Sequence, residues 1–431
     1  MSTKETNSPA CRFCGEPLTH TFVDLGMQPL CESYVTADQL NHMEPFYPLH
    51  VRVCDNCYLV QLEEYVSPKE IFSEYAYFSS YSEAWLKHAK NYVDMITTRL
   101  RLSEKSLVVE IASNDGYLLQ FFAKHGVPVL GIEPAANVAE VAIKKDIPTI
   151  VDFFNLELAN AMIKKGQSAD LIVGNNVLAQ VTDLNGFVES MKILLKPSGV
   201  ITMEFPHLMN LIEENQFDTI YHEHFSYFSL LTVEKIFEAH GLTIFDVDEL
   251  NTHGGSLRIY ACHKTDASKP TTTTLVELRK KEKQKGYEKL ETYSTFDEKV
   301  RSTKRNLLDY LIHLKRDKKK IAGYGAPGKG NTLLNYCGIR SDFLDFTVDR
   351  NPYKQGRFLP GTHIPILPPE QIEKTKPDYV FILPWNIKDE IMTQLSYIKD
   401  WGGKFIVPIP EVKIFDPSKK DFPARKHEVE Q

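Results

Sequence analysis

The sequence lacks any stretch that approaches the roughly 20 consecutive apolar residues needed to cross a bilayer. Its first residues, MSTKETNSPACRFCG, also lack the apolar core of a secretory signal. There is no basic surplus, because 50 Lys and Arg stand against 57 Asp and Glu and give a net charge of -7. A large basic surface for nucleic acid is therefore not expected. We expect a cytoplasmic protein with a small-molecule partner and with no membrane or nucleic-acid partner.

Cysteine is scarce, with seven residues in 431, and the count is odd. An odd number that includes two Cys-x-x-Cys pairs argues against a disulfide framework and favours a reducing compartment. Hydrophobic residues make up 42% and charged residues 25%, as in globular proteins. A chain of this length exceeds one ordinary core, so the sequence predicts about two to three domains.

Strands alternate with helices through the middle of the chain. Apolar runs such as LVVEIAS, VPVLGIEP, ADLIVGNNV and GVITMEFP read as strands, and helical segments separate them. This alternation predicts a parallel sheet covered on both faces. LTIFDVDE and SLRIYACH have no helix between them, so one of them should be antiparallel. Such a tail is typical of class I methyltransferases rather than of dehydrogenases.

We predict an α/β protein of three domains. Residues 1–72 form a zinc-binding module, and residues 73–265 form a Rossmann-like domain with a mostly parallel, seven-stranded sheet. Residues 266–431 form a smaller Rossmann-like domain. Its start is indicated by the linker TDASKPTTT, a charged helical segment and a second series of α/β patterns.

Two cysteine pairs in the N-terminal module have the spacing of a metal site. Cys11 and Cys14 form the first pair, and Cys54 and Cys57 form the second. Two such knuckles complete a tetrahedron around zinc, and Gly15 suits the tight turn of the first. The alternatives are unrelated buried cysteines or a redox-active pair. Four thiolates leave no open position, so we expect a structural zinc.

The turn after the first strand of the central domain has no glycine ladder to admit a pyrophosphate. Glu133 ends the second strand, placed to accept hydrogen bonds from a ribose diol. A dehydrogenase uses an acid there too, but the missing ladder favours S-adenosylmethionine, which has no phosphate. The alternative is an incidental α/β crossover. The predicted donor-binding residues are Glu110, Ser113, Asp115, Gly116, Tyr117, Glu133, Pro134, Asp152, Asn175 and Asn176.

The segment FDTIYHEHFSYFS gathers acid–base groups among aromatic residues. Tyr221, His222, Glu223 and His224 follow one another directly. The H-x-H spacing differs from the H-E-x-x-H of zinc proteases, so an acid–base role is favoured over a metal site. One histidine would act as a base near neutral pH, and a tyrosine would stabilise an oxyanion. A structural pair of histidines is the alternative.

With these segments the sequence resembles the three-domain sugar C-methyltransferases that act on nucleotide-activated 4-keto deoxyhexoses. The motifs run along nearly the whole chain, from CRFCG through EIASNDGYLL and YHEHFSYFS to GYGAPGKGNTLLNYCG. The resemblance implies that the first domain binds zinc, the second the methyl donor and the third the nucleotide-sugar. It implies methyl transfer to C3 of the sugar in the biosynthesis of branched deoxysugars.

The same resemblance assigns the catalytic residues. The family's catalytic tyrosine and histidine match Tyr221 and His224, with Glu223 beside them, and its active-site tyrosine before the first helix matches Tyr75. His224 would remove the C3 proton and Tyr221 would stabilise the enolate at the C4 oxygen. Where the family pattern reads A-H-V, this chain has Gln180, which can bind sugar hydroxyls but cannot act as a base.

The glycine-rich turn GYGAPGKGNT in the third domain is a candidate cradle for a diphosphate, through its amides and Lys329. Turns of this kind are also ordinary strand-to-helix connections. The predicted substrate-binding residues are Gln180, His222, Gly325, Ala326, Lys329, Asn331, Thr332, Asn351 and Trp385. We expect His222 to be structural rather than the base.

Three other functions stay open at this point. An O- or N-methyltransferase of a sugar or small metabolite would need no keto group. A nucleic-acid or protein methyltransferase would use the zinc module as a binding ribbon, which the acidic charge disfavours. A non-catalytic scaffold is disfavoured because the predicted donor-site acids are present. The sequence leaves open whether the chain is a monomer or a homodimer.

Overall fold

Two units make up the chain, and each is assembled from separated stretches of sequence. The first contains residues 1–20, 52–209 and 223–293, and the second contains residues 21–51, 210–222 and 294–431. The computed structural model describes residues 9–72 and 78–419. Tyr75 therefore lies outside the described residues. The predicted boundaries after residues 72 and 265 divide the chain differently from this packing, and they stay a prediction.

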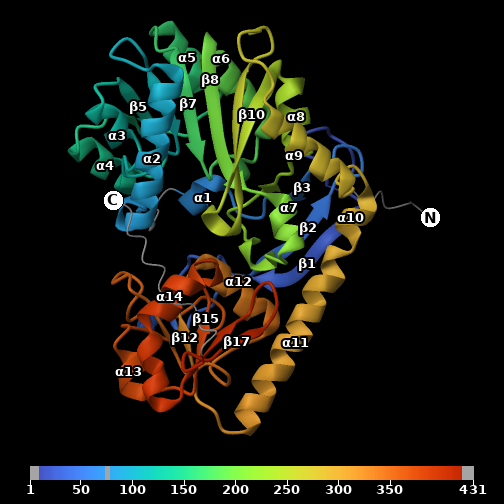
Figure 1. Cartoon of the computed structure of the whole chain (residues 1–431), viewed down its shortest axis with the longest axis vertical. Helices are drawn as coiled ribbons and strands as arrows, with labels where there is room; N and C mark the ends of the chain where they lie inside the picture. The colour runs from blue at the N-terminus through green and yellow to red at the C-terminus, as the bar shows by residue number, and fades with distance from the viewer. Residues whose placement is uncertain (1–8, 73–77, 420–431) are drawn as a thin grey trace. The chain divides into compact units, whose positions relative to one another are not determined.

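A seven-stranded sheet forms the centre of the first unit (Figure 1). Its strands are parallel except β11, which runs antiparallel to both of its neighbours, β8 and β10. This confirms the predicted antiparallel strand near the end of the domain. In spatial order the strands are β10 (Leu242–Leu250), β11 (Ser256–His263), β8 (Leu195–Pro206), β7 (Ala169–Asn175), β4 (Val108–Ile111), β5 (Val129–Ile132) and β6 (Thr149–Ile150).

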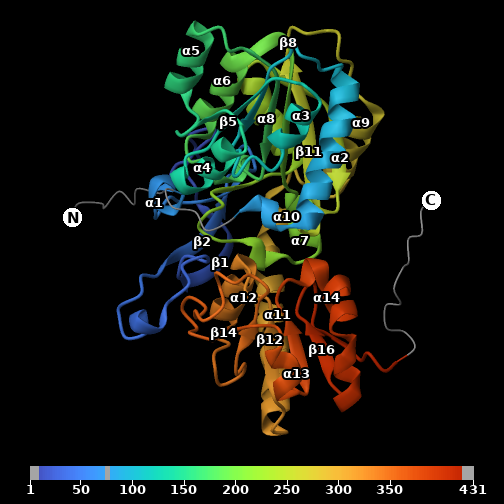
Figure 2. The same cartoon turned by 90° about the vertical axis from the view of Figure 1, so that its left-hand side faces the viewer.

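Helices pack on both faces of this sheet, as Figures 1 and 2 show. Side chains that cap the first turn begin several of them: Ser82 accepts from the N–H of Trp85, and Asn155 from that of Leu158. Buried residues of α2 and α3 pack with Leu171 and Val173 of the sheet to form one hydrophobic core. The helices are α2 (Glu83–Leu100), α3 (Leu119–Lys124), α4 (Ala136–Lys144), α5 (Leu156–Lys164), α6 (Leu184–Leu194), α8 (Leu230–Ala239) and α9 (Thr273–Gln284).

Part of the predicted zinc module belongs to this first unit. Strand β3 (Val60–Leu62) pairs antiparallel with β9 (Ser226–Tyr227), which lies in the predicted catalytic segment. The short helix α1 (Pro68–Phe72) comes next along the chain and buries Phe72. This part of the N-terminal module is therefore packed against the methyltransferase domain.

The second unit contains a six-stranded sheet, parallel except for β17. Helix α11 (Phe296–Arg316) precedes it and buries Val300, Leu307 and Leu311, a spacing that makes one apolar face. Strands β1 (His20–Gln28) and β2 (Tyr47–Val53) are neighbours in a separate sheet. The sheet order is β14 (Ile366–Leu367), β13 (Thr347–Val348), β12 (Ile321–Tyr324), β15 (Tyr379–Ile382), β16 (Lys404–Val407) and β17 (Lys413–Phe415), and the helices are α12 (Gly328–Cys337), α13 (Gln371–Thr375) and α14 (Lys388–Gln394).

The remaining short helical pieces include α7 (Leu208–Glu213), α10 (Leu290–Ser294) and the turn Leu178–Gln180. None of the helices within residues 9–72 and 78–419 combines the length and the apolar character that a membrane span requires.

Candidate functional site

The four paired cysteines converge on one point of the first unit. The Sγ atoms of Cys11, Cys14, Cys54 and Cys57 all lie within 4.8 Å of one another. Cross-knuckle pairs are separated by 3.6 Å and 3.5 Å. Four thiolates about 2.3 Å from a zinc ion stand about 3.8 Å apart in a tetrahedron, so the set fits zinc.

Both knuckles use the same backbone turn. The N–H of Gly15 donates to the carbonyl of Cys11, and the N–H of Tyr58 donates to that of Cys54. Gly15 and Tyr58 have φ values of 79° and 65°. Glycine adopts this conformation freely, whereas a residue with a Cβ does so at a cost of roughly 1–2 kcal/mol. Sequence inspection identified the first turn from its glycine and had no such signal for the second.

A buried amide supports the cysteine cluster. Gln61 Nε2 donates to Cys11 Sγ over 3.1 Å, and Gln61 Oε1 accepts from the N–H of Arg12 over 2.9 Å. A hydrogen bond to a ligating sulfur orients the ligand and stabilises its negative charge. These cysteines form a structural zinc site, and the four ligands leave no position for a substrate.

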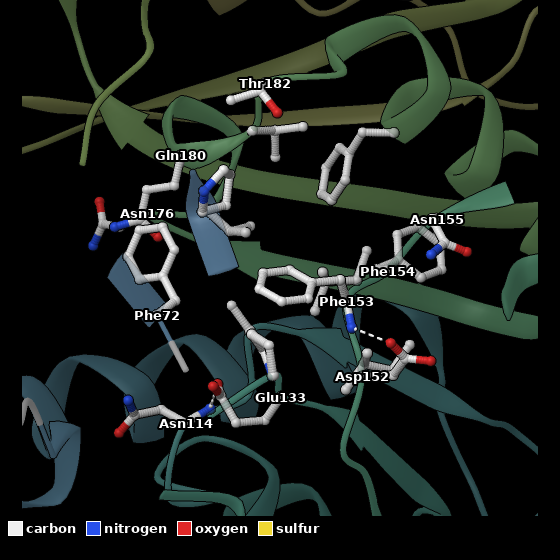
Figure 3. Close-up of a pocket in the computed structure, with 18 of the residues that line it drawn as sticks. Phe72, Asn114, Glu133, Asp152, Phe153, Phe154, Asn155, Asn176, Gln180 and Thr182 are labelled. Atoms are coloured by element: carbon white, nitrogen blue, oxygen red, sulfur yellow. Dashed lines mark hydrogen bonds between the residues drawn. The ribbon is translucent and has the colours of Figure 1, made fainter. Parts of the chain in front are cut away.

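A cavity of about 470 Å³ opens at the carboxyl ends of β4, β5 and β7 in the first unit (Figure 3). Ligands bind at this edge of parallel sheets because the strand-to-helix loops gather there. Seven predicted residues lie on the cavity wall: Tyr117, Glu133, Pro134, Asp152, Asn175, Asn176 and Gln180.

Glu133 is the buried acid of this cavity. Its two carboxylate oxygens accept hydrogen bonds from the N–H groups of Asn114 and Ala135, each over 2.9 Å. Burial raises the pKa of Glu133, although these two amides favour the ionised form. Each oxygen keeps a lone pair for a further donor, which fits the two hydroxyl groups of a ribose.

The other predicted donor residues lie behind the wall. Glu110 is fully buried on β4, and burial raises its pKa well above the usual range. Ser113 packs against Gly131, where an added Cβ would lie 2.4 Å from the serine oxygen. Asp115 accepts from the N–H of Ser80 and lies 3.6 Å from Lys145 Nζ. These contacts shape the loop, and direct donor contacts by these residues stay predictions.

Gly116 has a packing role that the sequence did not indicate. Its φ is 74°, and a Cβ there would approach the side chains of Ile147 and Ala142 to 3.2 Å and 3.3 Å. The glycine thus permits a left-handed turn and close contact with α4. Close approach of its backbone to the donor stays a prediction.

Aromatic rings line much of the cavity, and sequence inspection did not select them. Phe72 and Phe153 project into it, and Trp85 and Phe154 lie on its wall (Figure 3). Trp85 begins α2 and stacks on His88 with ring centroids 4.9 Å apart. Apolar walls with a few polar groups are typical of small-molecule sites. The signal available was the pair of phenylalanines after Asp152, at the end of a predicted strand.

The predicted base His224 belongs to the first unit and is 7% exposed. Its ring meets Tyr227 edge-on, with centroids 6.1 Å apart. The next residue, Phe225, donates its N–H to the carbonyl of Ala179 over 2.7 Å. Ala179 precedes Gln180, which lines the donor cavity. The backbone after His224 is therefore fixed to the loop that carries this cavity wall.

His222 belongs to the second unit and is buried. Its Nε2 lies 3.2 Å from the carbonyl oxygen of Pro48, and its ring contacts Tyr47 edge-on. Burial lowers the pKa of His222, because a buried ring loses the solvation of its charged form. These contacts agree with a structural role. Tyr221 belongs to the second unit and Glu223 to the first. Their catalytic roles stay predictions.

The glycine-rich turn of the second unit joins β12 to α12. The N–H of Ala326 donates to Asp349 Oδ2 over 2.7 Å. A carboxylate of the chain itself therefore accepts the hydrogen bond of this amide, which was predicted to bind a diphosphate. Gly325, Asp349 and Lys354 lie on a cavity of about 220 Å³ at the carboxyl ends of the strands. Sequence inspection missed Asp349, although an acid about 20 residues after a glycine-rich turn is a known signal. Asn351 donates its N–H to the other oxygen of Asp349.

Three further predicted substrate residues make contacts within the second unit. Asn331 Nδ2 donates to the carbonyl of Cys31, and Thr332 Oγ1 to that of Ile220. Lys329 Nζ donates to Asn386 Oδ1 over 2.8 Å and lies 4.9 Å from the centroid of the Trp385 ring. Contacts of these side chains with a substrate stay predictions.

Comparison with known proteins agrees with this layout. Three family models match successive parts of the chain: "Putative zinc binding domain" over residues 11–72, "Methyltransferase domain" over 85–247 and "C-methyltransferase C-terminal domain" over 251–410. The C-methyltransferase NovU of Streptomyces niveus is 36% identical over 407 residues, which cover 94% of this chain and 96% of NovU. The chain belongs to the zinc-containing C-methyltransferase family. It is an S-adenosylmethionine-dependent methyltransferase with a structural zinc site.

More distant relatives match a smaller part of the chain. A ubiquinone biosynthesis O-methyltransferase of Chelativorans sp. (strain BNC1) is 28% identical over 95 residues, 22% of this chain and 38% of that protein. Among solved structures, an S-adenosylmethionine-dependent methyltransferase from Clostridium acetobutylicum ATCC 824 has a TM-score of 0.34 and 11% identity. The match covers 41% of this chain and 92% of that one.

Proposed function

We propose that this C-methyltransferase transfers a methyl group to C3 of a nucleotide-linked 4-keto-deoxyhexose by way of an enolate. The hydrogen bond from Phe225 to Ala179 carries the proposal, because it fixes the residue after His224 to the wall of the donor cavity. A carbon acid needs a base close to the methyl donor. His224 is a buried imidazole in that neighbourhood of the first unit.

The chemistry divides between two side chains. His224 removes the C3 proton, which the adjacent C4 ketone makes acidic, and Tyr221 donates a hydrogen bond to the enolate oxygen. When bound, S-adenosylmethionine supplies an electrophilic methyl group that the C3 carbanion accepts, and S-adenosylhomocysteine is left. Glu223 and Tyr75 complete the proposed catalytic set.

On the substrate side, Gln180 binds sugar hydroxyl groups from the wall of the donor cavity. Its amide donates and accepts hydrogen bonds but takes no proton in this pH range, so a single imidazole base is left in the proposed set. The nucleotide is held by the second unit, through Lys329, Asn351, Trp385 and the turn at Gly325. The substrate class that we propose is therefore a diphosphate-linked 4-keto sugar.

A panel of 4-keto nucleotide-sugars with isotopically labelled donor tests the proposal. We expect a product whose added methyl carbon is bonded to C3 in the NMR spectrum. The matched 4-hydroxy sugars should give no product, because their C3 proton is not acidic. A methyl group on oxygen or nitrogen would refute the enolate route and favour the O- or N-methyltransferase alternative.

A further inference from the structure

Arg12 lies between the first two zinc ligands and reaches the wall of the donor cavity. We propose that Arg12 is a positioning residue for the methyl donor: it couples the zinc site to the donor cavity, so that zinc and S-adenosylmethionine bind with linked free energies. The proposal concerns donor binding alone and does not depend on the identity of the sugar.

The guanidinium of Arg12 bonds three backbone carbonyls in two segments of the first unit. Nη1 donates to the carbonyls of Val181 and Thr182, each over 3.4 Å, and Nη2 donates to the carbonyl of Leu62 on β3. Val181 and Thr182 line the donor cavity (Figure 3). A charged group that bonds several carbonyls fixes them more strongly than neutral donors do.

The backbone of the first knuckle makes a second connection. Asn185 Nδ2 donates to the carbonyls of Arg12 and Phe13 over 3.3 Å and 3.0 Å. Asn185 lies in the first turn of α6, where Asp183 caps the helix by accepting from the N–H of Gly186. Asp183 and Gly186 also line the cavity. The knuckle is therefore bonded to the cavity wall through both side chain and main chain.

The far end of the zinc module supplies another part of the wall. Ser67, Lys69 and Phe72, at and beside α1, line the same cavity, and Phe72 is labelled in Figure 3. One segment of the module thus lines the donor site, and the first knuckle is hydrogen-bonded to its wall. Arg12 and Leu62 connect them through β3.

Linkage follows from this arrangement. Zinc holds the knuckle in the conformation that presents Arg12, because metal coordination stabilises the local fold. Bound donor fixes the loop at Val181 and Thr182, which holds Arg12 and the knuckle in turn. Coupling between two binding equilibria is reciprocal, so bound donor must strengthen zinc binding by the same factor with which zinc strengthens donor binding.

The test uses the full-length, zinc-loaded protein. We compare Arg12→Gln and Arg12→Lys with wild type by metal analysis and by calorimetry with S-adenosylmethionine. We expect one zinc per chain in all three and a donor Kd weaker by roughly tenfold in Arg12→Gln, the loss of charge-assisted hydrogen bonds. Arg12→Lys should lie between them, because one ammonium replaces part of the donor set. The matched control is Arg279→Gln, which removes the ion pair between partly exposed Arg279 of α9 and Glu234 of α8 and should leave the Kd unchanged.

A second measurement tests the linkage directly. A chromophoric chelator that competes with the protein measures the zinc affinity at equilibrium, with and without saturating S-adenosylhomocysteine. We expect zinc to bind wild type several-fold more tightly with the nucleoside bound, and this gain to disappear in Arg12→Gln. Equal zinc affinities in wild type, or a zinc-loaded Arg12→Gln with the wild-type donor Kd, would overturn the proposal.

Discussion

Glu133 accepts a hydrogen bond from the backbone N–H of Asn114 over 2.9 Å, which joins the end of β5 to the loop after β4. The second oxygen accepts from the N–H of Ala135 in the same way. Glu133 therefore holds the two loops of the cavity in place through these hydrogen bonds, whether or not S-adenosylmethionine is bound. Its removal disturbs two buried amides as well as a ribose contact.

We expect Glu133→Ala to weaken S-adenosylmethionine binding by roughly 100-fold, because each lost or unsatisfied buried hydrogen bond costs about 1–3 kcal/mol. Glu133→Gln keeps one carbonyl acceptor and should lose less. Calorimetry without any sugar measures both. Glu140→Ala, an exposed acid on α4, is the control. Wild-type affinity in Glu133→Ala would show that the assigned ribose contact is wrong.

Proton removal at C3 should be separable from methyl transfer. With a 4-keto nucleotide-sugar and a non-reactive donor analogue, wild type should exchange C3–H for solvent deuterium, observed by NMR. His224→Ala should lose exchange and methylation and still bind the donor. Tyr221→Phe should keep the base and lose a hydrogen bond to the enolate oxygen, with a rate loss of about 10²–10³.

His222→Ala is the matched control for His224→Ala. His222 contacts the carbonyl of Pro48, so its removal should lower the midpoint of thermal unfolding more than the exchange rate. Exchange lost in His222→Ala and retained in His224→Ala would reverse the two roles. If neither substitution affects exchange, the base lies elsewhere, and Tyr75 is the first residue to test.

One zinc ion per chain should be found by metal analysis. Cys54→Ser should lose it and expose the knuckles to proteolysis, because coordination supplies much of the local folding free energy. Cys337→Ser, a buried cysteine of α12 outside the cluster, should keep the metal. Purified protein that contains no zinc and in which all four predicted ligand thiols react with a thiol reagent would refute the structural role.

Asp218 should make stability depend on pH. The carboxyl accepts from Trp385 Nε1 over 2.7 Å, and burial raises its pKa to about 6, against the attraction of Lys329. The unfolded state, with an ordinary pKa near 4, releases this proton first as pH rises. The contribution of Asp218 to the free energy of unfolding is thus fully present below about pH 4. It is lost, by up to about 3 kcal/mol, as pH rises through 6.

Asp218→Asn removes this titration and should flatten the profile between pH 4.5 and 7.5. Urea unfolding at several pH values, followed by tryptophan fluorescence, measures it. Asp317→Asn, at an exposed position after α11, should keep the wild-type slope. The same fall in Asp218→Asn and wild type would assign the pH dependence to another group.

Local sequence patterns predicted the fold well where an element depends on residues close in sequence. LVVEIAS and ADLIVGNNV contain the strands β4 and β7, and the pair LTIFDVDE and SLRIYACH contains the antiparallel β10 and β11. The spacing of the cysteines alone predicted their cluster, because two short knuckles bring four thiolates together with few other requirements. These features depend on residues close in sequence.

Contacts between segments far apart in sequence could not be predicted from such local patterns. Arg12 meets Val181 and Thr182 across about 170 positions, and nothing in CRFCG indicates that partner. Phe72 reaches the donor cavity from the end of the zinc module in the same way. The positive φ of Tyr58 had no glycine to reveal it. Each depends on tertiary packing, which overrides local preference.

The chain enters and leaves each unit repeatedly, since the first unit draws on residues 1–20, 52–209 and 223–293. During synthesis five strands of its sheet and the zinc knuckles are present before the last of these segments, which carries β10 and β11. The first unit cannot be completed until Tyr293 has left the ribosome, and by then residues 21–51 and 210–222 await partners still to be translated. The nascent chain therefore exposes apolar surface of both units until these partners have been translated.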